Sequence, residues 1–336
     1  MAIYPKSKMS TLHTHLARRG VTFDEYKGHS NITLPHVDDF SLSVPFDYPI
    51  DVTSIGRIAV VCHLYYPEMA AEFSQYFENI PCPFDLYIST DSIQKRDAIL
   101  AVFSSWKIGR VEVVVVPNRG RDIAPKLALL SAINSKYDFV VCIHSKASTH
   151  HEDLKKWRGF LLHHLLGSPE IVKSILELFA VAPEIGMIGP QHHEPIRKWL
   201  GWSGNYEITR DVARRLGIEL MTNHVLDFPS GSMFWARTSA LKPLIDLNLA
   251  AEDFAPEEGQ KDETIAHAIE RLFYFSVECA GYKWVKIADS KYFNEMPGTV
   301  QVGSRDILKM VVSEKTSTLT KQLAGNGVGK DNDGRP

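Results

Sequence analysis

The chain has 336 residues, with 37 Lys and Arg against 40 Asp and Glu, and a formal net charge of −3. Apolar residues make up 44% and charged residues 23%, ordinary values for a soluble globular protein with a buried core. The balanced charge argues against a protein that mainly coats nucleic acid or an acidic membrane, and four scattered cysteines without a CxxC pair predict neither a disulfide framework nor a zinc ribbon.

The two ends of the chain differ from its middle. Residues 1–54 lack clear periodicity and are predicted to form an N-terminal extension that packs on the main domain or precedes it. Residues 316–336 are predicted to form a flexible tail. The first twenty residues resemble no secretory signal, and no apolar run could cross a bilayer. The sequence therefore predicts a cytoplasmic protein, which could also lie peripherally at the inner face of the plasma membrane through a partner.

Residues 55–315 are predicted to form one folded domain. Short apolar runs predict strands at 58–62, 85–88, 111–116, 139–143, 185–188 and 233–236. Helical patterns are expected at 68–77, 93–103, 123–133, 154–166, 170–179 and 261–279. The alternation in the first half predicts an α/β fold with a mostly parallel sheet and helices on both faces. In such folds ligands bind beyond the carboxyl ends of the strands.

An arginine-rich loop follows the third predicted strand, with the sequence Asn118-Arg119-Gly120-Arg121-Asp122. Asp122 is placed to cap the next helix. A strand–loop–helix junction offers free backbone N–H groups and the positive end of a helix dipole, and the two arginines suit a phosphate group. The alternative interpretation is an arginine-rich turn whose guanidinium groups pair with surface carboxylates.

His144-Ser145-Lys146 ends the fourth predicted strand. Most nucleotide-sugar enzymes with a fold of this type carry a metal-binding DxD at that strand end. A lysine could neutralise a departing diphosphate directly, which is part of what a divalent ion does. The alternative is a histidine that hydrogen-bonds a loop beside an exposed lysine. Three histidine doublets elsewhere lack the spacing of a zinc site, so no metal site is predicted from them.

Residues 257–263 place four carboxylates just before the last predicted helix. One of them could act as a general base beside an acceptor hydroxyl. Acidic residues also gather at helix N-termini for structural reasons, and Asp262 would make a good N-cap. Upstream, the aromatic segment 227–237 and the pair Trp199 and Trp202 could present sugar-binding faces, or could equally form core.

Four stretches together resemble the rhamnan synthesis protein F family, bacterial glycosyltransferases that build rhamnose-rich polysaccharides. They are residues 116–125, 144–146, 231–237 and 258–271, in the family's order. Each stretch is weak alone, and the four in order are fairly specific. One departure is Glu263, where the family is expected to have glycine, which bears on the shape of the helix start.

The resemblance implies a GT-A-like glycosyltransferase fold, a nucleotide-sugar donor such as dTDP-L-rhamnose, and a glycan acceptor on a lipid carrier, as in lipopolysaccharide O-antigen. Transfer with inversion needs a carboxylate to deprotonate the acceptor while positive groups hold the leaving diphosphate. The residues that the resemblance assigns are Asp262, then Glu258, as catalytic base; Arg119, Arg121, His144 and Lys146 for the donor diphosphate; His63, Tyr65, Asp91, Asn118 and Asp122 for the nucleoside; and Gly231, Ser232 and Trp235 for the acceptor.

No resident cofactor is predicted, although Mg²⁺ or Mn²⁺ could take part if Asp91 or Asp122 helped to hold an ion. Other glycosyltransferases of the same pathway are candidate partners. A different class of function is a catalytically silent module that binds a glycan or such a partner. Nucleic-acid binding rests only on the arginine loop, and the acidic balance disfavours it.

Overall fold

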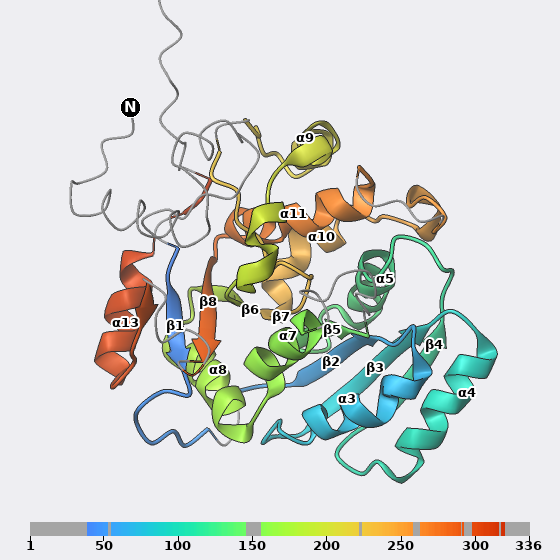
Figure 1. The fold of residues 1–336 in the computed structure, drawn as a ribbon, viewed down its shortest axis with the longest axis horizontal. Coiled ribbons are helices and arrows are strands. Elements are labelled where there is room, and N and C mark those ends of the chain that lie inside the picture. Colours follow the sequence, from blue (N-terminus) through green and yellow to red (C-terminus); the bar gives the residue numbers. More distant parts are fainter. Residues whose placement is uncertain are drawn as a thin grey trace, which may run out of the picture.

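The computed structural model describes residues 39–52, 55–145, 156–221, 224–257, 263–289, 291, 298–315 and 317–319. Within these residues, a nine-stranded sheet forms the centre of the molecule, in the order β4-β3-β2-β5-β7-β6-β8-β1-β9 (Figure 1). The strands are β1 (Ser41–Val44), β2 (Ile58–His63), β3 (Phe84–Thr90), β4 (Val111–Val115), β5 (Phe139–His144), β6 (Ile185–Pro190), β7 (Phe234–Arg237), β8 (Lys283–Asp289) and β9 (Thr299–Val300).

β7 alone among these strands runs antiparallel to both of its neighbours, β5 and β6. The remaining pairings of the described sheet are parallel. The carboxyl ends of β2, β3, β4, β5, β6 and β8 therefore meet at one edge of the sheet, together with the amino end of β7. We call this the carboxyl edge.

Helices cover both faces of the sheet (Figure 1). The α-helices are α3 (Ala70–Phe77), α4 (Ile93–Val102), α5 (Ile123–Ile133), α7 (Trp157–Leu166), α8 (Pro169–Val181), α9 (Tyr206–Arg215), α10 (Lys242–Ile245), α11 (Ile265–Cys279) and α13 (Arg305–Glu314). Short 3₁₀ helices are η1 (Pro67–Met69), η2 (Phe103–Ser105), η3 (Glu194–Trp199), η4 (Ser203–Asn205), η5 (Thr238–Leu241) and η6 (Ala251–Asp253). Side chains of α3, α4, α7, α8 and α13 pack in one core, and those of α5, α9, α10 and α11 in a second core.

β2 shows why a central strand of this sheet is mainly apolar. Ile58, Val60 and Cys62 belong to the first core, whereas Ala59 and Val61 belong to the second. Successive side chains of a strand point to opposite faces, so a strand covered on both faces needs apolar residues at every position. This confirms the predicted fold class, a mixed and mostly parallel α/β sheet with helices on both faces.

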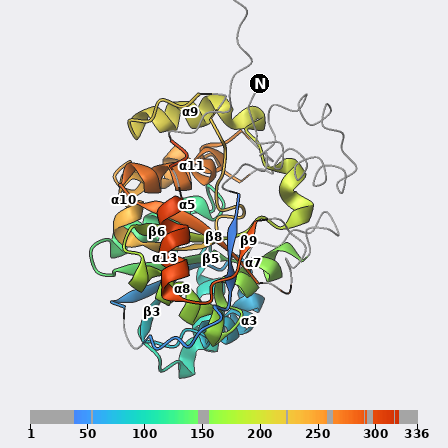
Figure 2. The same cartoon turned by 90° about the vertical axis from the view of Figure 1, so that its left-hand side faces the viewer.

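The predicted ends of the domain need correction. β1 pairs in parallel with β8 and β9 inside the sheet, so residues from 39 onward are part of the fold and not an extension that ends near residue 54. At the other end, the backbone N–H groups of Thr318 and Leu319 donate to the Glu278 carboxylate, at 2.8 Å each. The packed chain thus continues beyond the predicted start of the tail at 316. Figure 2 shows α13 lying at the β1 side of the sheet.

The helix predicted to begin at residue 261 begins at Ile265. Glu263 has a φ of 63°, in the left-handed region that a helix excludes, and Thr264 is extended. The sequence departure at Glu263 thus falls on a backbone conformation that suits glycine.

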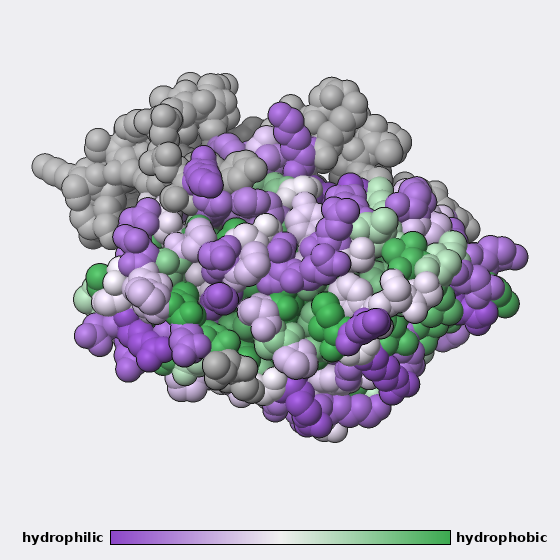
Figure 3. Space-filling view, turned by 90° about the horizontal axis from the view of Figure 1, so that it is seen from below, coloured by the Kyte–Doolittle hydropathy of each residue, from purple (hydrophilic) through white to green (hydrophobic). Residues whose placement is uncertain are grey.

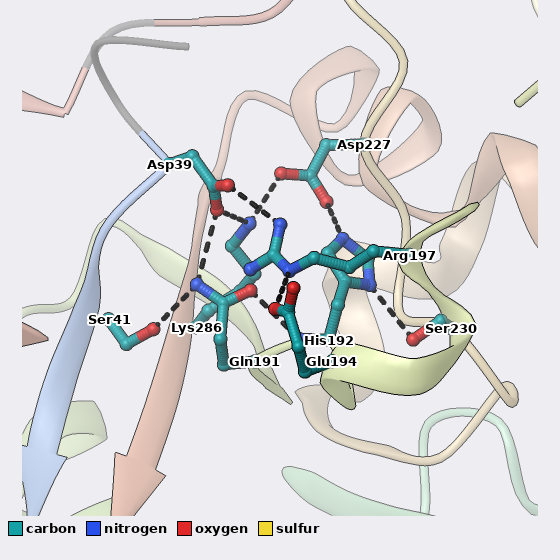
Figure 4. Close-up of polar contacts among 9 residues, drawn as sticks. All are labelled: Asp39, Ser41, Gln191, His192, Glu194, Arg197, Asp227, Ser230 and Lys286. Carbon is teal, nitrogen blue, oxygen red and sulfur yellow. Dashed lines mark hydrogen bonds and ion pairs between the residues drawn. The ribbon is translucent and has the colours of Figure 1, made fainter. Parts of the chain in front are cut away.

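A buried ionic cluster joins four segments that are distant in the sequence (Figure 4). Lys286 Nζ lies 2.5 Å from Asp39 Oδ1 and 2.7 Å from Asp227 Oδ2. Arg197 Nη1 donates to Asp39 Oδ2 at 2.9 Å, and His192 Nε2 lies 3.0 Å from Asp227 Oδ1. Two positive and two negative side chains are therefore balanced within the core, and they hold the segment before β1 against β8.

None of the helices in the described part of the chain combines the length and hydropathy needed to cross a lipid bilayer. The face seen in Figure 3 carries apolar groups interrupted by polar side chains.

His164 makes stability dependent on pH. Its side chain is buried, Nδ1 donates to the Phe160 carbonyl at 2.7 Å, and burial lowers its pKa to about 4. The unfolded chain, with a histidine pKa of about 6.5, takes up a proton at a higher pH than the folded chain does. Stability from this residue is therefore complete above pH 6.5 and is lost as the pH falls toward 4.

We expect His164 to account for about 2 kcal/mol of the stability lost between pH 7 and pH 5. Urea unfolding of the wild type and of His164→Leu at both pH values measures this contribution. The variant should be less stable at pH 7 but should lose less stability on acidification. An equal loss in both proteins would contradict the assignment.

Candidate functional site

Polar side chains meet where β2, β3 and β5 end at the carboxyl edge. The strand register places His63 opposite Ser89 of β3 and opposite His144 of β5. His63 Nδ1 lies 3.0 Å from Ser89 Oγ, and the Ser145 N–H donates to the His63 carbonyl at 2.9 Å. Burial lowers the pKa of His63 to about 4, against the opposing attraction of Asp122, so the ring is neutral near pH 7.

Asp91 and Tyr65, both predicted to border a nucleoside, lie around one lysine. Lys95 Nζ sits 2.6 Å from Asp91 Oδ1 and 3.6 Å from the centroid of the Tyr65 ring. The structure thus brings together His63, Tyr65 and Asp91 at neighbouring strand ends. Sequence reasoning missed Lys95, which follows Asp91 by four residues on the first turns of α4.

The arginine loop is held by the segment that precedes α11. Gly120 and Arg121 have φ values of 64° and 56°, which produces a tight turn. Arg119 Nη1 donates to the Phe254 carbonyl at 3.0 Å, and the Arg121 N–H donates to Glu257 Oε1 at 2.9 Å. Both arginine side chains remain partly exposed, and Asn118 is exposed. A small hollow between the loop and the start of α11 is lined in part by Arg121 and Glu257.

The conformation of this loop predicts the effect of a side chain at Gly120. A Cβ there would lie 2.5 Å from Phe254 Cδ1 and 2.7 Å from the Ala124 Cβ. We expect Gly120→Ala to lower the free energy of unfolding by about 1–3 kcal/mol, because strain at positive φ adds to the clash. Gly159→Ala is the matched control, since no atom lies within 4 Å of its Cβ. Equal melting temperatures of the two variants would contradict the expectation that residue 120 tolerates no side chain.

Asp122 and His144 are joined by buried contacts. Asp122 stands at the N-cap position of α5 but makes no capping hydrogen bond, so the predicted cap is wrong. Its Oδ2 instead accepts from Lys126 Nζ at 3.0 Å and lies 3.6 Å from His144 Nε2. His144 is buried, and its Nε2 donates to the Gly231 carbonyl at 2.7 Å. His144 is therefore engaged inside the protein, and its predicted contact with a donor diphosphate needs correction.

Lys126 and Glu270 hold the turn before β7, and neither was predicted. Buried Lys126 Nζ donates to the Ser232 carbonyl at 2.6 Å. Glu270 Oε1 of α11 accepts from the Gly231 N–H at 3.1 Å and from Ser232 Oγ at 3.2 Å. Gly231 and Ser232 have φ values of 81° and 56°, so the turn depends on these contacts for its shape. The turn lies at the carboxyl edge, beside His144.

The tryptophans predicted to present sugar-binding faces are largely buried in the core. Trp235 is fully buried, and its Nε1 donates to the Leu165 carbonyl at 3.1 Å, so it cannot present a sugar-binding face. Trp202 is also buried, whereas Trp199 is 47% exposed. Gly231 and Ser232 are buried as well, which leaves their predicted acceptor contact without an exposed surface in this conformation.

Three predicted site residues, Lys146, Glu258 and Asp262, lie outside the described residues. Glu257, which precedes Glu258, lies against the arginine loop. Glu263, which follows Asp262, donates its backbone N–H to Asn205 Oδ1 at 2.9 Å. Among the residues with described positions, no group of three His, Cys, Asp or Glu side chains could hold a metal ion.

The domain thus has a mostly parallel sheet, and the arginine loop lies at the carboxyl edge, where open α/β sheets bind their ligands. The chain belongs to the rhamnan synthesis protein F family, whose model matches residues 38–282. The match begins just before β1, in agreement with the place of that strand in the sheet.

Two relatives, both described as uncharacterized protein WxcX, come from Xanthomonas campestris pv. campestris strains B100 and ATCC 33913. Each is 34% identical over 240 residues, which is 71% of this chain and 34% of the relative. The matched region thus spans about a third of the length of these curated relatives.

Two solved structures match this chain over part of their length. The mannosyltransferase PcManGT from Pyrobaculum calidifontis, in complex with GDP-Man and Mn²⁺, is 13% identical, with a TM-score of 0.41 over 73% of this chain and 58% of that chain. The 4-diphosphocytidyl-2C-methyl-D-erythritol synthase from Anaerococcus prevotii is 8% identical, with a TM-score of 0.35 over 76% of this chain and 94% of that chain.

Proposed function

We propose that this chain is a glycosyltransferase of bacterial polysaccharide synthesis. Membership of the rhamnan synthesis protein F family supports this proposal. The observation that carries it is the arginine loop, whose partly exposed Arg119 and Arg121 stand at the carboxyl edge beside the start of α11. Two guanidinium groups there suit the diphosphate of a nucleotide-sugar donor.

The proposed donor is dTDP-L-rhamnose, and the proposed acceptor is a glycan on a lipid carrier at the inner face of the plasma membrane, as in O-antigen assembly. Arg119 and Arg121 would hold the diphosphate, while His63, Tyr65, Asp91 and Asn118 would border the nucleoside. Asp262, or else Glu258, would take the proton of the acceptor hydroxyl as the sugar is transferred with inversion. Lys146 remains a proposed diphosphate contact.

Calorimetric titration with dTDP, UDP and GDP tests the donor site. We expect one diphosphate to bind selectively, and Arg121→Ala to weaken it about tenfold or more, because a charge-assisted hydrogen bond is lost. Arg57→Ala is the matched control, since exposed Arg57 precedes the opposite, amino end of β2. Unchanged affinity in Arg121→Ala, with the melting temperature also unchanged, would remove the loop from the site.

A further inference from the structure

The two helices that leave β3 and β4 at the carboxyl edge begin with the same Asp-x-x-x-Lys pattern. Asp91 and Lys95 stand at the start of α4, and Asp122 and Lys126 stand at the start of α5. In both, the ammonium reaches back to the carboxylate, with Nζ–Oδ distances of 2.6 Å and 3.0 Å. The repeat places two fixed cations at neighbouring strand ends.

The positions of these lysines are unusual in electrostatic terms. The N-terminal end of a helix carries a partial positive charge, so a cation in the first turns is disfavoured by about 0.3–1 kcal/mol. Each lysine has further contacts besides its aspartate: the Tyr65 ring for Lys95, and the Ser232 carbonyl for Lys126. The Lys126 ammonium also lies over the Phe234 and Phe273 rings. Each of these two helices thus begins with an Asp–Lys ion pair, at the end where a helix favours an anion.

The two lysines differ in access to solvent. The Lys95 side chain is 26% exposed, so a ligand at the carboxyl edge can reach it. The Lys126 side chain is 2% exposed, and its ammonium donates hydrogen bonds to Asp122 and to the Ser232 carbonyl. Lys95 can therefore contact a phosphate, whereas Lys126 can act only through the groups that it holds.

The paired carboxylates do not fit a divalent cation. Mg²⁺ and Mn²⁺ take carboxylate oxygens as ligands, and here Asp91 Oδ1 and Asp122 Oδ2 each lie within 3.0 Å of an ammonium group. A metal ion would have to displace Lys95 from Asp91, or a buried lysine from Asp122. Both aspartates that could have helped to hold an ion are therefore already neutralised by the chain itself.

We infer that Lys95 is a further diphosphate-binding residue, that Lys126 is a positioning residue which keeps Asp122 occupied, and that donor binding needs no divalent ion. This inference rests on the proposed function, because it concerns the same donor site. It assigns part of the charge neutralisation that a metal ion supplies in other enzymes to the Lys95 ammonium group.

Calorimetric titration of the full chain with dTDP, UDP and GDP, in EDTA and then in Mn²⁺, tests the inference. We expect the wild-type dissociation constant for the diphosphate that binds best to agree within about threefold between the two conditions. Lys95→Ala should weaken binding about tenfold or more in EDTA. Mn²⁺ should restore part of that loss in the variant alone, because the Asp91 carboxylate is then free to take a metal ion.

Lys136→Ala removes the same charge from an exposed lysine just beyond the far end of α5 and should leave the affinity unchanged. Lys95→Arg should restore most of the affinity in EDTA. Wild-type binding that EDTA weakens more than about tenfold would overturn the inference while leaving the proposed function intact. The inference is also overturned, with the proposed function intact, if Lys95→Ala binds the diphosphate with the same affinity as Lys136→Ala. Failure of all three diphosphates to bind under either condition would overturn the proposed function together with the inference.

Discussion

Replacement of Asp262 by asparagine is expected to slow sugar transfer by about 10²–10⁴-fold while leaving donor affinity unchanged. The amide has nearly the same size as the carboxylate but cannot accept the acceptor's proton. The described neighbours support this choice of base, since Glu257 Oε1 accepts from the Arg121 N–H and Ile265 lines the hollow beside the arginine loop. The described residues on either side of Asp262 thus lie beside the proposed diphosphate site.

Transfer rates under saturating donor, with donor affinity from calorimetry, measure this effect. Glu252→Gln is the matched control, because Glu252 is an exposed carboxylate of η6 in the same part of the chain. Glu258→Gln distinguishes the second candidate base. Transfer by Asp262→Asn at the wild-type rate would mean that another group accepts the proton, whereas parallel loss of donor affinity would mean that Asp262 binds donor instead.

The second large effect concerns stability. Lys286→Met is expected to lower the free energy of unfolding by about 3–5 kcal/mol, because Asp39 and Asp227 lose the ammonium that they share in a buried cluster. The methionine fills a similar volume, so the lost charge dominates the effect. Asp39 keeps Arg197 as a partner and Asp227 keeps His192, which favours the lower half of that range.

Urea unfolding of Lys286→Met against Lys242→Met separates burial from charge. Lys242 pairs with Asp246 at the surface, with side chains 61% and 54% exposed, and such pairs contribute about 0–1 kcal/mol. The double variant Lys286→Met, Asp227→Asn should recover part of the loss, because it removes one buried charge of each sign. A Lys286→Met variant no less stable than Lys242→Met would contradict the role of the cluster.

The strands and helices of the first half were predictable because their signal is local. Ile58–His63 and Phe139–His144 are covered on both faces, so every position before the final histidine is apolar and the run is visible in the sequence. β1 was missed because Ser41-Leu42-Ser43-Val44 is short and half polar, and its place comes from pairing with β8, more than two hundred residues away. No local pattern encodes such a pairing.

The site was predictable in outline and not in its contacts. Strand ends and the arginine loop were visible, because the carboxyl edge of a parallel sheet follows from the alternation of strands and helices. Trp235 was misplaced because its sequence neighbourhood cannot show that Leu165 accepts its N–H. The signal that could have found Lys95 and Lys126 was the Asp-x-x-x-Lys repeat, since residues four apart on a helix are neighbours.

The measurement that tests the central claim most directly is the release of rhamnose and dTDP from dTDP-L-rhamnose, with and without a lipid-linked glycan acceptor. An active transferase should release dTDP slowly to water and much faster with its acceptor, and Asp262→Asn should suppress both reactions. A protein that binds dTDP but releases none from the sugar nucleotide, with or without acceptor, would contradict the proposed activity. That result would favour a catalytically silent module that binds a glycan or a glycosyltransferase partner.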